Sequence, residues 1–241
     1  MLMVHGITSS RDELGLFSGL AQHLAGSGIP SFRFDYRCHG VNKRPTQFLT
    51  LSGVVNDIEA AARAAIDATH ASRVHIVGMS FGGGLSAYWA ATTRRAVFSV
   101  VMFAPVLDYE EDTLGQYDLL SDGMLTLKAA RELKRSGSLK AGGIRYGGAL
   151  LNELPYFSGL NAVSRLTCPC LIVHGDADSI VPFASSERVT KENPKCQLVN
   201  IPDTDHGFGV EGDEDLTSPE TKEKHEQVFN AVSEFLTKVD T

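Results

Sequence analysis

Cysteine is scarce in this sequence of 241 residues, and no two cysteines have the spacing of a metal or redox motif. The four cysteines are Cys38, Cys168, Cys170 and Cys196. One residue, rather than two, separates Cys168 from Cys170, and in an extended segment their side chains would point to opposite faces. We therefore predict reduced structural thiols rather than a metal or redox site.

Long apolar runs and clusters of basic residues are also missing. The longest apolar runs have the length of a strand, so no segment is expected to span a membrane. Met1 is followed directly by a short apolar stretch, without the basic region, apolar core and cleavage site of a secretory signal, and the expected location is the cytoplasm. The net charge of −7 argues against nucleic acid or an anionic membrane as a partner.

The sequence does contain an alternation of strand and helix patterns. With 43% hydrophobic residues, the chain can bury the core of a single α/β domain, expected over residues 1–241. Apolar runs predict a strand ending at Val4 and further strands over 31–34, 73–77, 97–103, 170–174 and 197–201. Helical periodicity occurs at 14–24, 52–70, 85–91, 184–191 and 219–238. The alternation predicts a mostly parallel sheet with helices on both faces.

Residues 109–165 interrupt this alternation and are predicted to form an inserted cap. The stretch is acidic at first, basic around 128–140, interrupted by glycine pairs at 142–143 and 147–148, and lacks a strand as apolar as 97–103. One helix is expected near 124–134. Its aromatic residues are candidates either to line a pocket for an aromatic acid or to form the core of the cap: Tyr109, Tyr117, Tyr146, Tyr156 and Phe157.

The motif Gly-x-Ser-x-Gly at residues 78–82 lies between a predicted strand and a predicted helix. A turn this sharp holds Ser80 in a strained backbone region, and the small residues Gly78 and Gly82 avoid a clash. The helix then directs its N–H groups and positive dipole end at the seryl oxygen. A glycine-rich turn with an incidental serine is the alternative reading.

Ser80 requires a base to act as a nucleophile, and the base requires a carboxylate to hold its tautomer. His206 follows the last predicted strand, and Asp178 follows the strand before it. Because ligands bind at the carboxyl ends of parallel strands, these residues are expected on one rim of the sheet. The chain order Ser80, Asp178, His206 is the one expected for a serine on such a turn.

Other histidines and acids compete with this choice. His174 ends a strand but precedes the acid, and His225 is expected to be a solvated helix residue. Asp176 is an alternative acid, although it is expected to brace its loop by accepting backbone N–H groups. Asp205 is adjacent to His206 in sequence and is expected to face away from its ring.

Acyl transfer also needs N–H donors for the oxyanion that forms at the carbonyl. The residue after the nucleophile supplies one, so the Phe81 N–H is the first candidate. The second is expected in the loop after the first strand, where Gly6 allows close approach of the backbone. We choose the Ile7 N–H, and expect the His5 side chain to brace this loop.

Five segments together carry a family resemblance, at residues 4–6, 34–40, 78–83, 174–182 and 205–208. With them the sequence resembles the α/β-hydrolase fold family, most closely the cinnamoyl and feruloyl esterases and related small serine carboxylesterases, which carry a similar insert after the sixth strand. The resemblance implies Ser80 as nucleophile, His206 as base and Asp178 as acid, with oxyanion donors at Ile7 and Phe81.

In the family, two more strands normally precede the segment that begins here at Met1, so either they are absent or the start of the chain is trimmed. If they are absent, the strand at 31–34 becomes an open sheet edge. Such an edge can pair with a second chain, so a homodimer is a prediction. The expected activity is that of a serine hydrolase on carboxylic esters of small or aromatic acids, with no metal or organic cofactor. An acyl thioesterase, an acyltransferase, a peptidase and a non-catalytic binding protein on the same scaffold are the alternatives.

Overall fold

A computed structural model of the chain describes residues 1–239; the last two residues of the expected domain lie outside the described residues. The described residues form a six-stranded sheet in the order β10-β9-β4-β3-β1-β2, and all neighbouring strands are parallel. The strands are β1 (Leu2–Val4), β2 (Phe32–Arg33), β3 (Val74–Met79), β4 (Val97–Phe103), β9 (Cys170–Gly175) and β10 (Cys196–Ile201). The sheet confirms the predicted α/β architecture.

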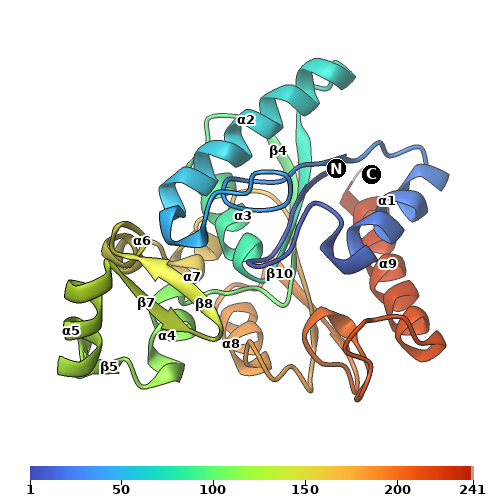
Figure 1. Cartoon of the computed structure of the whole chain (residues 1–241). Helices are drawn as coiled ribbons and strands as arrows, with labels where there is room; N and C mark the ends of the chain where they lie inside the picture. The colour runs from blue at the N-terminus through green and yellow to red at the C-terminus, as the bar shows by residue number, and fades with distance from the viewer. Residues whose placement is uncertain (240–241) are drawn as a thin grey trace.

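Helices cover both faces of the sheet (Figure 1). One face carries α1 (Leu16–Gly26) and α9 (Pro219–Val239), and the other carries α2 (Leu51–Thr69), α3 (Phe81–Thr92), α7 (Gly159–Ser164) and α8 (Phe183–Glu192). Alternate strand residues face the two layers: on β3, Val77 lies in the core with α1 and α9, and Ile76 in the core with α2 and α3. Burial on both faces explains why these strands are almost continuously apolar.

The segment between β4 and β9 contains more strands than the sequence pattern indicated. Its elements are α4 (Tyr109–Thr113), η3 (Gly115–Tyr117), β5 (Leu120–Ser121), β6 (Met124–Leu125), α5 (Leu127–Ser136), β7 (Ser138–Ala141), β8 (Ile144–Gly147), α6 (Gly148–Glu153), η4 (Leu154–Tyr156) and α7. The expected helix is α5, but two antiparallel hairpins flank it. Gly142 and Gly143, both at positive φ, form the two-residue turn of the β7–β8 hairpin.

This segment is attached to the amino end of α2. The Glu153 carboxylate accepts hydrogen bonds from the Leu51 N–H at 2.5 Å and the Ser52 N–H at 3.2 Å, where the helix dipole favours a negative charge. The short helix η2 (Thr46–Phe48) lies beside β8, and the Thr46 hydroxyl donates to the Arg145 carbonyl at 3.2 Å. In Figure 1, α5 and the β7–β8 hairpin project on the left, away from α1 and α9.

Two further findings concern the exterior. Within residues 1–239, no helix combines the length and the apolar character needed to cross a bilayer. β2 occupies one edge of the six-stranded sheet, and the pairing of this edge with a second chain stays a prediction.

The close packing of α3 can be tested at Gly84, with Gly26 at the end of α1 as a control. A Cβ at Gly84 would overlap the Val106 carbonyl oxygen and lie 2.8 Å from the Tyr109 hydroxyl, whereas a Cβ at Gly26 meets no atom within 4 Å. We expect Gly84→Ala to lower the free energy of unfolding by about 1–3 kcal/mol, because the backbone at Val106 cannot move cheaply. Gly26→Ala, the matched control, should raise it by roughly 0.5–1 kcal/mol. Urea unfolding measures both; equal effects would contradict the packing at α3.

Candidate active site

Ser80 occupies a strained turn between β3 and α3. Its φ of 52° and ψ of −118° are backbone values that a non-glycine residue rarely adopts. A Cβ at Gly78 would overlap the Gly82 carbonyl oxygen, and a Cβ at Gly82 would overlap the carbonyl oxygens of Val4 and His5. The turn therefore accepts only glycine at both positions, and it holds Ser80 at the amino end of α3.

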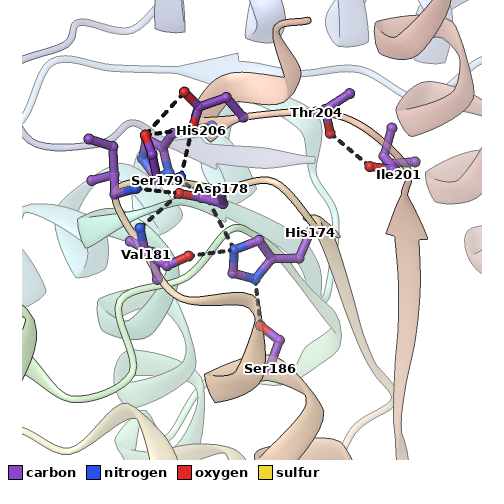
Figure 2. A network of polar contacts seen from close by, with 10 residues as sticks. His174, Asp178, Ser179, Val181, Ser186, Ile201, Thr204 and His206 are labelled. Carbon is purple, nitrogen blue, oxygen red and sulfur yellow. Dashed lines mark hydrogen bonds and ion pairs between the residues drawn. The ribbon is translucent and has the colours of Figure 1, made fainter. Parts of the chain in front are cut away.

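An acid–histidine pair lies on the rim at the carboxyl ends of β9 and β10. The Nδ1 atom of His206 is 2.8 Å from Oδ2 of Asp178, whose side chain is fully buried (Figure 2). The other carboxylate oxygen, Oδ1, accepts the N–H groups of Ile180 and Val181 at 2.8 Å each. Both carboxylate oxygens of Asp178 are thus held by hydrogen bonds. The His206 ring remains accessible, with 21% of its side chain exposed.

His174 is a second histidine on the same carboxylate. Its Nε2 lies 3.1 Å from Asp178 Oδ2 and 3.1 Å from the Val181 carbonyl oxygen, while its Nδ1 lies 2.7 Å from the Ser186 hydroxyl (Figure 2). Burial would raise the pKa of Asp178, but the hydrogen bonds from His174 and His206 outweigh it and hold that pKa well below its usual range. Asp178 therefore stays ionised.

Sequence reasoning considered His174 only as a competing base and missed its contact with the acid. Chain order argues against a base that precedes the acid, but it does not exclude a second donor. One signal was available: a histidine in an otherwise apolar, fully buried strand needs polar partners. Its partners are Asp178, four residues further along the chain, and Ser186, twelve residues further along.

The loops that carry the pair are joined to each other. The Asp205 carboxylate accepts the Ser179 N–H at 2.7 Å and the His206 N–H at 2.7 Å, so it faces away from the His206 ring and connects the two loops. Asp176 accepts the Asp203 N–H at 2.8 Å, which confirms that Asp176 braces its loop through a backbone N–H. Neither carboxylate contacts the imidazole of His206.

His225 is buried, and the prediction that it is solvated is wrong. It lies on the inner face of α9, and its Nε2 is 3.0 Å from the Gly207 carbonyl oxygen in the short helix η5 (His206–Phe208). Burial lowers the pKa of His225, so its neutral form is favoured. His225 thereby holds the residue that follows His206.

The loop after β1 approaches Ser80 closely. A Cβ at Gly6 would lie 3.4 Å from the Ser80 Cβ. Within residues 1–239, neither the Ile7 N–H nor the Phe81 N–H donates to another protein group. An oxyanion site requires free N–H donors near the nucleophile, so Ile7 and Phe81 stay the predicted donors.

Glu13, in the short helix η1 (Glu13–Gly15), is a buried carboxyl that the sequence did not point to. Its Oε2 accepts the Gly6 N–H at 2.5 Å. Burial raises the pKa of Glu13, while the hydrogen bond from Gly6 and the charge of His206 oppose this rise. Glu13 is thus a near neighbour of both the loop after β1 and His206. A cavity of about 580 Å³, lined in part by the Glu13 and His206 side chains, gives His206 access to solvent.

The five aromatic residues of the cap have different environments. Tyr109 is buried, its hydroxyl donates to the Phe81 carbonyl at 2.5 Å, and its ring meets the Phe81 ring edge to face at 5.2 Å. Tyr146 is buried, Phe157 is half-buried against Tyr88, and Tyr156 is 78% exposed. The hydroxyl of the partly exposed Tyr117 lies at Gly142. Tyr109 contacts the turn that holds Ser80; for the other four the structure gives no contact with Ser80 or His206.

No group of three or more His, Cys, Asp or Glu side chains with the geometry of a metal site occurs within the described part of the chain.

A model of the alpha/beta hydrolase family matches residues 1–217. The chain belongs to the alpha/beta hydrolase family. The uncharacterized protein YfhR of Escherichia coli O157:H7 is 26% identical over 182 residues, which are 73% of this chain and 52% of YfhR. The chain thus spans about half the length of that curated relative.

Solved structures of other α/β hydrolases have the same fold. Est1E from Butyrivibrio proteoclasticus with ferulic acid bound has a TM-score of 0.77 at 22% identity, over 98% of this chain and 87% of Est1E. Mouse alpha/beta hydrolase domain-containing protein 10 has a TM-score of 0.74 at 18% identity, over 99% and 89%. A monoacylglycerol lipase from Paleococcus ferrophilus has a TM-score of 0.66 at 19% identity, over 97% and 93%. These likenesses confirm the predicted fold.

In this α/β hydrolase, the fully buried His5 makes stability depend on pH. Burial lowers the pKa of His5 to about 4, against about 6.5 in an unfolded chain. The folded pKa is depressed, so the contribution of neutral His5 is complete above about pH 6.5 and is lost as pH falls toward about 4. By about pH 5 the loss should reach roughly 2 kcal/mol.

The matched variant is His5→Asn, whose side-chain amide can still donate to the Gly6 carbonyl that His5 Nδ1 contacts at 2.8 Å. Urea unfolding at about pH 7.5 and about pH 5 should give a smaller pH-dependent loss for His5→Asn than for the wild type, by about 2 kcal/mol. The same loss in both proteins would show that His5 does not titrate in this way.

Proposed function

We propose that this protein is a serine hydrolase that cleaves carboxylic esters of small or aromatic acids through an acyl-enzyme intermediate. The observation that carries the proposal is the 2.8 Å contact between His206 Nδ1 and the buried Asp178 carboxylate, on the rim where Ser80 occupies its strained turn. Membership of the alpha/beta hydrolase family supports the same reaction class.

In this mechanism, the Asp178 carboxylate accepts a hydrogen bond from the Nδ1–H of His206, which leaves the lone pair of Nε2 free to act as the base. The Ser80 Oγ attacks the ester carbonyl carbon as His206 takes its proton. The N–H groups of Ile7 and Phe81 donate to the oxyanion, each contributing about 2.7–4 kcal/mol to the stability of the transition state.

Collapse of this intermediate breaks the bond to the alcohol oxygen, and His206 gives that oxygen its proton. A water molecule then loses a proton to His206 and attacks the carbonyl carbon of the acyl-enzyme. Collapse of this second intermediate breaks the bond to Ser80 Oγ, which takes the proton back from His206, and the acid is released. No metal or organic cofactor takes part. Asp178 is suited to this role because its hydrogen bonds keep it ionised and fix it in place.

The acyl group is proposed to be small or aromatic. Support comes from the overall likeness to Est1E, whose structure holds ferulic acid. A panel of p-nitrophenyl esters from acetate to cinnamate, run beside acyl-CoA thioesters and with added alcohols as acceptors, tests this assignment. Faster turnover of thioesters, or transfer to an alcohol in preference to water, would replace ester hydrolysis with thioesterase or acyltransferase activity.

Removal of the proposed nucleophile should abolish activity without disturbing the fold. Ser80→Ala is expected to lower kcat for p-nitrophenyl acetate by on the order of 10⁵–10⁶-fold. It should also prevent covalent labelling by a fluorophosphonate, with an unchanged circular dichroism spectrum. Labelling or turnover that persists in this variant would remove Ser80 from the mechanism.

Two neighbouring carboxylates provide a matched test of the acid. Asp178→Asn loses the acceptor that fixes the His206 tautomer and is expected to lower kcat by about 10⁴-fold. Asp176→Asn changes a carboxylate that binds the Asp203 N–H at the surface, and it should keep most of the activity. If Asp176→Asn were the inactive variant, the choice of acid would be wrong.

A further inference from the structure

Two buried side chains hold the carbonyl group of Gly6. The Tyr36 hydroxyl donates to this oxygen at 3.0 Å, and Nδ1 of His5 lies 2.8 Å from it. The Gly6 carbonyl and the Ile7 N–H belong to one peptide group. The described chain contains no cis peptide bond, so this N–H points opposite to the carbonyl. The direction of the Gly6 carbonyl therefore sets the direction of the Ile7 N–H.

Tyr36 is well fixed for this contact. It is 1% exposed, and its ring stacks on the His5 ring with the centroids 3.9 Å apart and an interplanar angle of 9°. It also forms an edge-to-face pair with the His39 ring, whose centroid is 4.5 Å away. Burial raises the pKa of Tyr36 well above its usual value, so its hydroxyl keeps the proton it donates. A phenylalanine would fill the same space; the hydroxyl adds one contact, and that contact is to Gly6.

The loop that carries Tyr36 holds the loop after β1 at three places. The Asp35 carboxylate accepts the Arg11 backbone N–H at 2.7 Å as well as its guanidinium. Tyr36 binds the Gly6 carbonyl, and the Thr8 N–H donates to Nε2 of His39 at 3.2 Å. The three contacts fall on both sides of Ile7, so they restrict the peptide group that carries its N–H.

Glu13 holds the other side of Gly6. Its carboxylate accepts the Gly6 N–H at 2.5 Å, while Tyr36 and His5 hold the carbonyl. Glycine is the residue whose flanking peptides rotate most freely, because it has no Cβ to restrict φ and ψ. With one of these contacts removed, the Gly6–Ile7 peptide gains freedom to turn, and its carbonyl oxygen would then repel a developing oxyanion.

We propose that Tyr36 is a positioning residue, whose hydroxyl holds the Gly6–Ile7 peptide so that the Ile7 N–H is directed at the oxyanion. The inference rests on the proposed function, because it assumes that an oxyanion forms at Ser80. It assigns to the loop after β2 a part in catalysis without contact with the substrate. The orientation of the Ile7 N–H affects the free energy of the transition state rather than that of the bound substrate.

The test compares Tyr36→Phe with the wild type on p-nitrophenyl acetate. The variant keeps the ring stack on His5 and loses only the hydroxyl. We expect kcat to fall roughly 10- to 100-fold, less than the loss of a whole oxyanion donor, with KM within about twofold of the wild type. Phenylboronic acid, which forms a tetrahedral adduct on a nucleophilic serine, should bind more weakly by a factor similar to the fall in kcat.

Tyr88→Phe is the matched control, because it removes the hydroxyl of a half-buried tyrosine on α3 that has no contact with the loop after β1. It should keep kcat and boronate affinity within about twofold of the wild type. All proteins are assayed well below their melting midpoints, so that lost stability does not reduce kcat.

The outcomes separate the inference from the proposed function. A Tyr36→Phe variant with wild-type kcat, or with a lowered kcat but unchanged boronate affinity, would overturn the positioning role and leave the proposed function intact. A wild-type protein that neither hydrolyses esters nor binds the boronate would overturn both. A fall in kcat together with boronate affinity, at constant KM, is the result expected of an oriented oxyanion donor.

Discussion

The close approach of α3 to the end of β1 is the constraint on which the site depends. Gly82 fits against the carbonyl oxygens of Val4 and His5 only because it has no side chain. The same contact brings the first turn of α3, with Ser80 at its start, beside the loop that contains Gly6 and Ile7. The proposed nucleophile and both proposed oxyanion donors are therefore positioned by backbone packing. A strained φ at Ser80 is sustained because β3, β4 and α3 fix the peptides around it.

A buried ionised carboxylate is costly unless it is fully hydrogen-bonded, and Asp178 meets this condition with four donors. Two donors are backbone N–H groups of its own loop, and these depend on the conformation of the loop rather than on its side chains. The other two are histidines. His174 fixes the carboxylate from inside the sheet, through a chain of contacts that ends at Ser186 on α8. The Asp178 carboxylate is thus oriented by contacts other than the one with His206, and it offers His206 a preorganised acceptor.

The sequence predicted those parts of the fold and site that depend on local pattern and chain order. The turn at Ser80 has a local signature of glycines, and the order of Ser80, Asp178 and His206 along a parallel sheet predicts a common rim. The contacts of His174, Glu13 and Tyr36 depend instead on which loops meet in space. His225 shows the same limit: its helix was correctly predicted, but the inner face of α9 meets η5, and no periodicity within the helix reveals that partner.

The hairpins of the cap were missed for a different reason. β5 and β6 have two residues each and β7 and β8 have four, which is too short for an alternating pattern to differ from loop sequence. The glycine pair at 142–143 was noticed as an interruption, although two glycines at positive φ are also the signature of a tight hairpin turn. Strand pairing of this kind becomes evident only when both sides of the turn are considered together.

Contacts between the cap and the core include one at the turn that holds Ser80. The core supplies the proposed reacting groups from β1, β3, β9 and β10, and these are fixed by buried strands and paired loops. The cap meets this core through Glu153 at the amino end of α2 and through Tyr109 at the carbonyl of Phe81. Tyr109 contacts the residue after Ser80, its hydroxyl is already paired, and only 1% of the residue is exposed. This contact therefore braces the turn that holds Ser80 and offers a ligand neither a free hydroxyl nor an open ring surface. The proposed reacting groups are held by the core, and Tyr109 connects the cap to them through the carbonyl of Phe81.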